Sequence, residues 1–195
     1  MKHIIVEGGD GLGKNTLIKN LCNYFDYNHV TIRHFDKPPK GMDAKETLAF
    51  QFEVFYKEIL FVDHIRQSLD SDDLGYHENI VIWNRSHLGE YVYSQMFRGI
   101  NRKEVSEKLR LFEERNLYTD MFLITLTAEP RFFHAQEDGD SFSQNLEQKT
   151  QELQLFKEAH ALSMIPNKKI VKVNQGNNYK GKEIIFEEVI QLIEN

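Results

Sequence analysis

Short apolar runs alternate along the chain with longer segments in which apolar residues recur every three or four positions. The short runs are typical of buried strands, and the longer spacing is that of helices with one apolar face. Strands are predicted at residues 3–7, 30–34, 80–83, 121–126 and 169–173. Helices are predicted at residues 16–25, 44–69, 102–115, 148–163 and 183–193. This alternation predicts an α/β fold of right-handed, parallel βαβ units with helices on both faces of the sheet.

No internal repeat or linker interrupts the alternation, so we expect a single domain over residues 1–195. A hydrophobic content of 41% is sufficient for one packed core. Cys22 is the only cysteine and cannot form a disulfide within the chain. No apolar run reaches the roughly 18 residues of a membrane span, and the chain opens on a strand and a glycine-rich loop rather than a secretion signal. We therefore expect a cytoplasmic protein, and the net charge of -6 argues against one that coats nucleic acid.

A glycine-rich loop joins the first predicted strand to the first predicted helix, with the sequence Gly8-Gly9-Asp10-Gly11-Leu12-Gly13-Lys14. The spacing G-x4-G-K at such a junction is typical of a phosphate-binding loop. Backbone N–H groups and the helix N-terminus surround the anion there, and glycines let the backbone approach phosphate oxygens closely. A glycine-rich turn with a solvated lysine is the simpler alternative, and the spacing favours phosphate binding. The predicted ATP contacts are Gly8, Gly9, Gly11, Leu12, Gly13, Lys14, Asn15 and Thr16.

The position after the lysine departs from the common pattern, in which a Ser or Thr hydroxyl binds Mg²⁺. Here Asn15 stands at that position and Thr16 follows it. Either the Thr16 hydroxyl or the Asn15 amide oxygen could replace the missing ligand, since oxygen ligands suit a hard cation. Alternatively, water and the nucleotide hold most of the metal.

The ten residues 7–16, E-G-G-D-G-L-G-K-N-T, resemble the E-G-x-D-G-x-G-K-x-T opening of thymidylate kinases. Trp83-Asn84-Arg85-Ser86, at the end of the third predicted strand, is similar to that family's signature of a hydrophobic strand followed by Asp-Arg. The stretch 86–98 resembles the phage-type members in particular. The resemblance runs in order along nearly the whole chain, and its specific parts are the loop and the region of residues 84–85.

The resemblance implies a P-loop kinase fold with a five-stranded parallel sheet. It also implies transfer of the γ-phosphoryl group of ATP, with Mg²⁺, to a deoxypyrimidine nucleoside monophosphate such as dTMP. By this comparison, Asp10 contacts the acceptor's sugar or positions its phosphate, and Arg85 steers the acceptor phosphate or the transferring phosphate. Asn84 stands where the family has Asp, so the candidate metal positions 15, 16 and 84 carry less negative charge than usual. Family members are commonly homodimers, and we expect a homodimer.

The resemblance also implies an acceptor site, with candidates at Asp36, Phe55, Phe61, Glu90 and Arg98. Asp36 lies in a proline-containing loop after the second strand, at the sheet edge where ligands of open α/β folds bind. A rigid turn is the alternative there. Phe55 or Phe61 of the long helix would stack on the base, although aromatic residues at helical spacing more often belong to the core. The polar stretch 174–181 either covers the adenine or is a surface loop.

Residues 129–145, after the fourth strand, are a candidate lid. Phosphoryl transfer depends on positioned positive charge rather than on covalent chemistry. Arg131 is the only arginine in an otherwise acidic tract, so it is the candidate for a third cation beside Lys14 and Arg85. An ordinary surface loop is the alternative.

Two other functions stay open. The first is a kinase of the same fold that acts on a deoxynucleoside or on a hydroxymethylated pyrimidine in DNA. Asn84 in place of Asp, and a candidate lid with a single arginine, suggest this altered acceptor site. The second is a nucleotide-binding protein without turnover, suggested by Asn15 and Asn84. The sequence contains neither the spacing of a zinc site nor a serine-nucleophile elbow.

Overall fold

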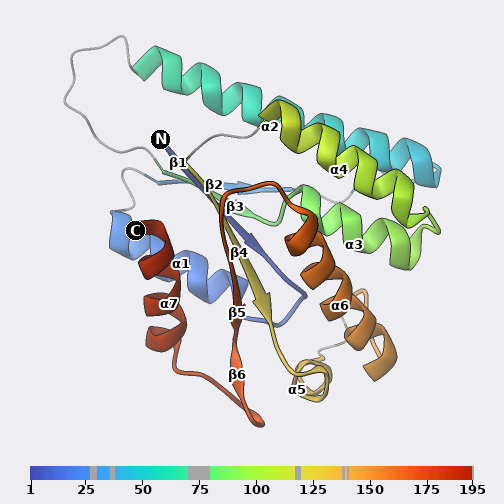
Figure 1. Ribbon diagram of the computed structural model, residues 1–195, viewed down its shortest axis with the longest axis vertical. Helices are drawn as coiled ribbons and strands as arrows, with labels where there is room; N and C mark the ends of the chain where they lie inside the picture. Colours follow the sequence, from blue (N-terminus) through green and yellow to red (C-terminus); the bar gives the residue numbers. More distant parts are fainter. Residues whose placement is uncertain are drawn as a thin grey trace.

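The computed structural model describes residues 1–26, 30–35, 38–69, 80–116, 120–137, 139 and 141–194, without the side chains of residue 63 and residues 65–69. A parallel sheet forms its centre, in the order β2-β3-β1-β4-β5 (Figure 1). The strands are β1 (Lys2–Glu7), β2 (Val30–His34), β3 (Ile80–Asn84), β4 (Met121–Thr127) and β5 (Asn167–Lys172). The predicted five-stranded parallel sheet is therefore confirmed, and β1 is its central strand.

The three inner strands are covered on both faces, which explains why they read as continuous apolar runs. On one side lie α1 (Lys14–Phe25) and α7 (Lys182–Glu194), and on the other lie α2 (Ala44–Leu69), α3 (His87–Phe97), α4 (Arg102–Asn116) and α6 (Leu146–Leu162) (Figure 1). Successive residues of β1 serve the two cores alternately: Ile5 packs with α2, α3 and α4, whereas Ile4 and Val6 pack with α1 and α7.

Three elements are absent from the sequence prediction. Helix α3 is buried over residues 87–94, so it has no polar face from which a helical period could be recognised. Helix α5 (Pro130–Ala135) is only six residues long and begins within the predicted lid. The third element is the hairpin of β6 (Asn174–Gln175) and β7 (Asn178–Tyr179), in the stretch predicted either to cover the adenine or to be a surface loop. In addition, β5 begins two residues before its predicted start, because Asn167 and Lys168 pair with β4.

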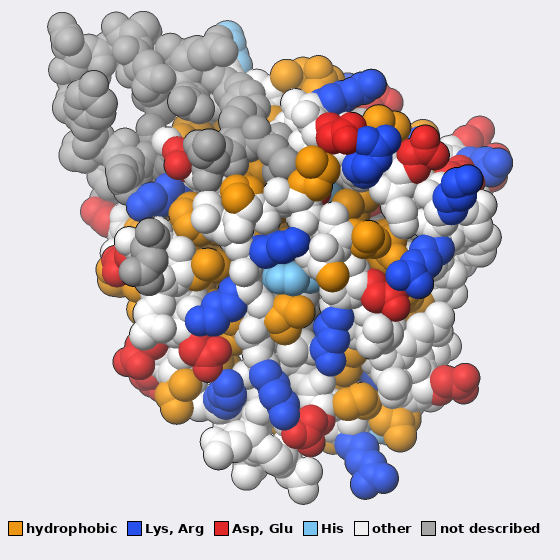
Figure 2. Space-filling model, in the orientation of Figure 1, with side chains coloured by type: hydrophobic (Ala, Val, Ile, Leu, Met, Phe, Trp, Pro, Cys, Tyr) orange, Lys and Arg blue, Asp and Glu red, His pale blue; other side chains and the backbone are white. Residues whose placement is uncertain are grey.

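All five parallel strands end at the same edge of the sheet, which is where open α/β folds bind ligands. The glycine-rich loop follows β1 at this edge. Asn84 is the last residue of β3, and Arg85 follows it. On the face shown in Figure 2, basic and acidic side chains are interspersed, which agrees with the mild net charge. Among the described helices, none has both the length and the apolar character required to cross a bilayer.

Candidate active site

The glycine-rich loop between β1 and α1 has the backbone conformation of an anion site. Gly13, which caps α1, has φ 85° and ψ 17°, a left-handed conformation that strongly favours glycine. Gly8 has φ 134°, and a β-carbon there would lie 2.7 Å from the carbonyl oxygen of Leu126. The first turn of α1 contains no acidic residue, so nothing in that turn offsets the positive end of the helix dipole.

Lys14 lies folded back under this loop, with 7% of its surface exposed. Its Nζ atom donates hydrogen bonds to the carbonyl oxygens of Gly8 (2.8 Å) and Gly9 (2.7 Å). The Asp10 carboxylate is 3.7 Å away. Burial, assisted by the nearby Arg85 cation, lowers the pKa of Lys14 to about 8. A phosphate bound in the loop would give this ammonium group a stronger partner than two carbonyl oxygens.

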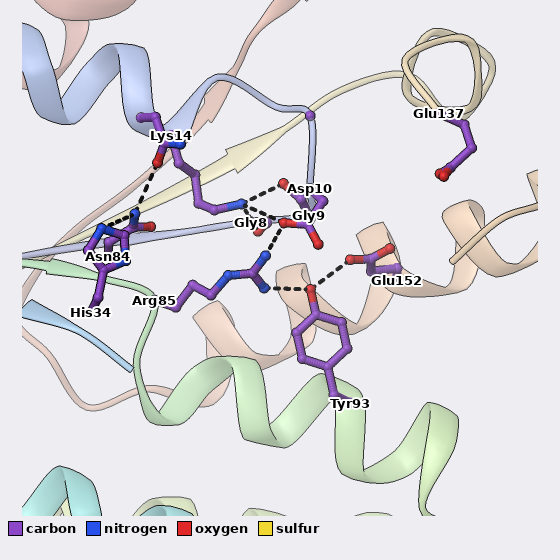
Figure 3. Close-up of polar contacts among 12 residues, drawn as sticks. Gly8, Gly9, Asp10, Lys14, His34, Asn84, Arg85, Tyr93, Glu137 and Glu152 are labelled. Atoms are coloured by element: carbon purple, nitrogen blue, oxygen red, sulfur yellow. Dashed lines mark hydrogen bonds and ion pairs between the residues drawn. The ribbon is translucent and has the colours of Figure 1, made fainter. Parts of the chain in front are cut away.

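Arg85 meets the loop from the end of β3. Its guanidinium forms an ion pair with Asp10, and its Nη1 atom donates to the hydroxyl of Tyr93 at 3.0 Å (Figure 3). The Arg85 backbone has φ 70°, an uncommon conformation for a residue with a side chain, and its N–H donates to the Val6 carbonyl at 3.0 Å. Strain of this kind clusters at functional sites, where the surroundings hold it in place.

The Tyr93 hydroxyl continues this network by donating to Oε1 of Glu152 at 2.9 Å (Figure 3). Burial raises the pKa of Tyr93 well above its usual value, so the phenol keeps its proton and can donate it. Burial also raises the pKa of the Glu152 carboxyl. Asp10, Arg85, Tyr93 and Glu152 therefore link the loop, β3, α3 and α6 in one chain of hydrogen bonds and ion pairs.

A second carboxylate, Glu7, lies fully buried beneath the loop. Its Oε1 atom accepts hydrogen bonds from Ser86 Oγ (2.8 Å) and from the Gly89 backbone N–H (3.2 Å). Its Oε2 atom has no hydrogen-bond partner among the described residues. Burial raises the pKa of this carboxyl above its usual value.

The predicted metal positions hold a pair of amides rather than an open oxygen site. Asn84 Nδ2 donates to Asn15 Oδ1 at 3.0 Å, so the Asn15 oxygen is engaged and Asn84 turns its nitrogen toward it. In the part of the chain that the structure describes, no group of three or more His, Cys, Asp or Glu side chains could hold a metal. Mg²⁺ requires oxygen ligands, so this amide pair does not fit a direct magnesium site, while the Thr16 hydroxyl stays a prediction.

Two hollows flank the loop. One, of about 280 Å³, is lined by the start of α1 and by the β6–β7 hairpin, including Thr16 and Tyr179. The Tyr179 hydroxyl donates to the carbonyl oxygen of Gly11, which ties the hairpin to the loop. The other hollow, of about 240 Å³, is lined by Asp10 and Arg85 together with aromatic side chains.

The second hollow collects most of the predicted acceptor residues. Phe55, Glu90 and Arg98 line it, and the last two form a partly buried ion pair. Phe61 does not line it: this ring is 51% exposed on α2, and the Arg33 guanidinium lies 4.8 Å from its centroid. Asp36 lies outside the described residues.

The candidate lid lies against the loop through α5. The Phe133 ring of α5 is fully buried, and the Lys149 ammonium of α6 lies 4.2 Å from its centroid and 2.5 Å from Glu137 Oε2. Arg131 is exposed at the start of α5. Among these residues the sequence singled out Arg131 and missed Phe133 and Lys149, whose roles depend on contacts across the fold. Tyr93 lies within the quoted thymidylate-kinase-like stretch, but no sequence signal links it to Glu152.

A five-stranded parallel sheet of this order, with a G-x4-G-K loop between its central strand and the following helix, is the P-loop kinase fold. Solved structures similar to this one include thymidylate kinases and related P-loop kinases. The thymidylate kinase of Candida albicans is 15% identical with a TM-score of 0.67, over 99% of this chain and 91% of that one. The thymidylate kinase of Ehrlichia chaffeensis is 17% identical with a TM-score of 0.64, over 98% of each chain.

A further similar structure is the YorR protein of Bacillus subtilis, solved in complex with phosphorylated GDP. It is 20% identical with a TM-score of 0.63, over 99% of this chain and 96% of that one. No protein-family model matches the chain, and no curated protein sequence matches it. At these identities the likeness is one of fold.

Proposed function

We propose that the protein is a nucleotide kinase that transfers the γ-phosphoryl group of ATP to a deoxypyrimidine nucleoside monophosphate, with dTMP as the first acceptor to test. The observation that carries this proposal is the position of Lys14, Asp10 and Arg85. Lys14 lies under the loop, and its neighbours Asp10 and Arg85 line the hollow that holds the acceptor candidates. Positive charge therefore lies where the transferring group would pass between donor and acceptor.

In this proposal the loop amides of residues 8–16 and Lys14 bind the phosphates of ATP, and the hollow beside Tyr179 receives the adenine. Arg85 binds the transferring phosphate or the acceptor phosphate, and Asp10 orients Arg85 through their ion pair. Phe55 contacts the acceptor base, and Glu90 and Arg98 are polar groups that line the same hollow. In-line transfer requires positioning and charge stabilisation rather than a covalent intermediate.

The segment 129–145 is the lid in this proposal, with Arg131 as its cation. Docking of α5 beside Gly9 and Gly11 supports this placement, since a β-carbon at Gly11 would lie 3.4 Å from Gln136. A homodimer is part of the same proposal and is tested by sedimentation equilibrium of the purified chain.

The test is an ADP-release assay with ATP, Mg²⁺ and, in separate reactions, dTMP, dUMP, dCMP, thymidine and single-stranded DNA with hydroxymethylated pyrimidines. Turnover on dTMP is the expected result. Turnover only on DNA or only on the nucleoside would replace the acceptor. ATP binding without turnover on any acceptor would favour a nucleotide-binding protein instead.

Lys14→Ala is expected to lower kcat by roughly 10²–10³-fold, the usual cost of removing one group that stabilises transition-state charge. The matched control is Lys19→Ala, which removes an exposed lysine from the same helix. Near-normal activity of Lys14→Ala would remove the loop from the mechanism.

A further inference from the structure

Three polar side chains from three different elements meet beside the phosphate-binding loop. Asn84 ends β3, His34 ends β2, and Asn15 lies in the first turn of α1. Asn84 Nδ2 donates to Asn15 Oδ1 at 3.0 Å and lies 3.2 Å from His34 Nε2 (Figure 3). Asn84 Nδ2 therefore lies within hydrogen-bonding distance of both the Asn15 oxygen and a ring nitrogen of His34.

The orientation of the Asn84 amide is paired with that of Asn15, whose oxygen faces it. Exchanging its oxygen and nitrogen would set an oxygen against the Asn15 oxygen, with no proton between them. In the orientation described, Asn84 Oδ1 is buried and has no hydrogen-bond partner among the described residues. An uncharged NH₂ group thus faces the Asn15 oxygen at position 84, where a carboxylate would offer a negatively charged ligand to a cation.

The charged side chains around the loop also favour direct binding of phosphate by the protein. Two cations, Lys14 and Arg85, face this end of the site, and Asp10 is the carboxylate that pairs with both. Glu7 lies below them, hydrogen-bonded to Ser86 and to the Gly89 backbone, and its carboxyl group also interacts electrostatically with both cations. Because position 84 is neutral, it adds no further negative charge beside Lys14 and Arg85, and both cations can contact phosphate oxygens directly.

We propose that this chain binds the ATP polyphosphate through its own cations and backbone donors, and that Asn15 and Asn84 contribute no ligand to a divalent ion. The ion arrives as the nucleotide's counter-ion and is not held by these residues. The inference rests on the proposed function in that the polyphosphate is taken to be that of ATP.

The test is isothermal titration calorimetry of ATP into the whole chain, once in a chelator and once with excess Mg²⁺. The wild type is expected to give dissociation constants that differ by less than about threefold, under ~0.7 kcal/mol. Asn84→Asp adds a negative charge next to the phosphates, so its affinity for ATP in chelator is expected to fall about tenfold or more, and Mg²⁺ is expected to restore it. Asn84→Leu is the matched control, because it removes both N–H donors without adding charge and should keep the metal independence.

Electron paramagnetic resonance with Mn²⁺ alone supplies a readout that needs no turnover. The nucleotide-free wild type is expected to leave Mn²⁺ free in solution, whereas Asn84→Asp should bind it. Asn15→Asp places the same charge at an exposed position of the cluster. It replaces Asn84→Asp in this experiment if Asn84→Asp fails to fold. Wild-type protein that binds ATP at least tenfold tighter with Mg²⁺ than in chelator would overturn the inference and leave the proposed kinase standing. Wild-type protein that binds ATP under neither condition would overturn both.

Discussion

The ring of Phe133 lies against the α-carbon of Gly9, so that a β-carbon at position 9 would be 2.2 Å from Phe133 Cζ. The backbone of Gly9 does not have a positive φ, so its conformation does not require glycine. The requirement for glycine here is therefore steric. Phe133 is fully buried and lies under the Lys149 ammonium, so it has little room to move away. The phosphate-binding loop and α5 are thus fitted to each other at one residue.

Gly9→Ala is expected to lower the free energy of unfolding by about 2 kcal/mol, because the new methyl group forces a buried ring or the loop to shift. Urea denaturation measures this loss. Combining Gly9→Ala with Phe133→Leu is expected to restore part of it, since the shorter side chain frees the space that the methyl group takes. Additive losses in the double variant would show that the two residues do not compete for the same volume.

The control for this variant is Gly181→Ala. A β-carbon at Gly181 has its first contact at 3.6 Å, an ordinary van der Waals distance. Its unfolding free energy should stay within about 0.5 kcal/mol of wild type.

Gly89→Ser is expected to stabilise the protein. Gly89 lies in α3, where glycine costs about 1 kcal/mol relative to alanine. A β-carbon there would lie 3.8 Å from Glu7 Oε2, the buried oxygen without a partner among the described residues. A serine hydroxyl can donate to that oxygen, so we expect a gain of about 1–2 kcal/mol in urea denaturation. Gly89→Ala separates the helix propensity from the hydrogen bond, because alanine improves the propensity without adding a hydroxyl. Equal gains in unfolding free energy for both variants would exclude the hydrogen bond.

Tyr93→Phe removes the hydroxyl that joins Arg85 to Glu152. We expect kcat/KM for the acceptor to fall about tenfold and the unfolding free energy to fall by about 1–2 kcal/mol, since both partners lose a buried hydrogen bond. Steady-state kinetics and urea denaturation measure the two effects. Tyr91→Phe on the same helix is the control: the Tyr91 hydroxyl is buried without a hydrogen-bond partner among the described residues, so its loss should cost nothing. Similar losses in both variants would remove Tyr93 from the positioning of Arg85.

The lowered pKa of Lys14 predicts a pH dependence in the nucleotide-free protein. Lys14 releases its proton near pH 8 in the folded chain and near 10.5 when unfolded, so unfolding takes up a proton between these values. The free energy of unfolding therefore rises with pH across this window, by about 1.4 kcal/mol per pH unit for one fully shifted group. Over the same window the affinity for ATP should fall, because the ammonium charge is lost.

Lys14→Met removes this contribution. Urea denaturation between about pH 8 and 9.5 should show wild type gaining about 1–2 kcal/mol relative to the variant. Parallel stability curves for the two proteins would contradict the prediction and place the Lys14 pKa at its ordinary value.

The parts of this protein that depend on local chemistry were predictable from the sequence. The loop that begins at Gly8 was recognisable because its glycines and Lys14 are contiguous and its conformation follows from their order. The inner strands were recognisable because a strand covered on both faces must be apolar throughout. Helix α3 was not predicted because residues 87–94 are all buried and show no helical period, and α5 was not predicted because six residues are too few for one.

The parallel α/β class and the phosphate-binding loop could be recognised without a structure, since both follow from patterns within short segments. The side chains that meet at the end of the sheet could not, because they are brought together by folding of the whole chain. Tyr93 and Glu152 are 59 residues apart, yet they share a hydrogen bond because α3 and α6 pack together. Asn84 contacts Asn15 and His34 because β2 and β3 end, and α1 begins, at the same edge of the sheet. Such contacts depend on the order and register of the strands, which packing of the whole chain fixes and no single segment encodes.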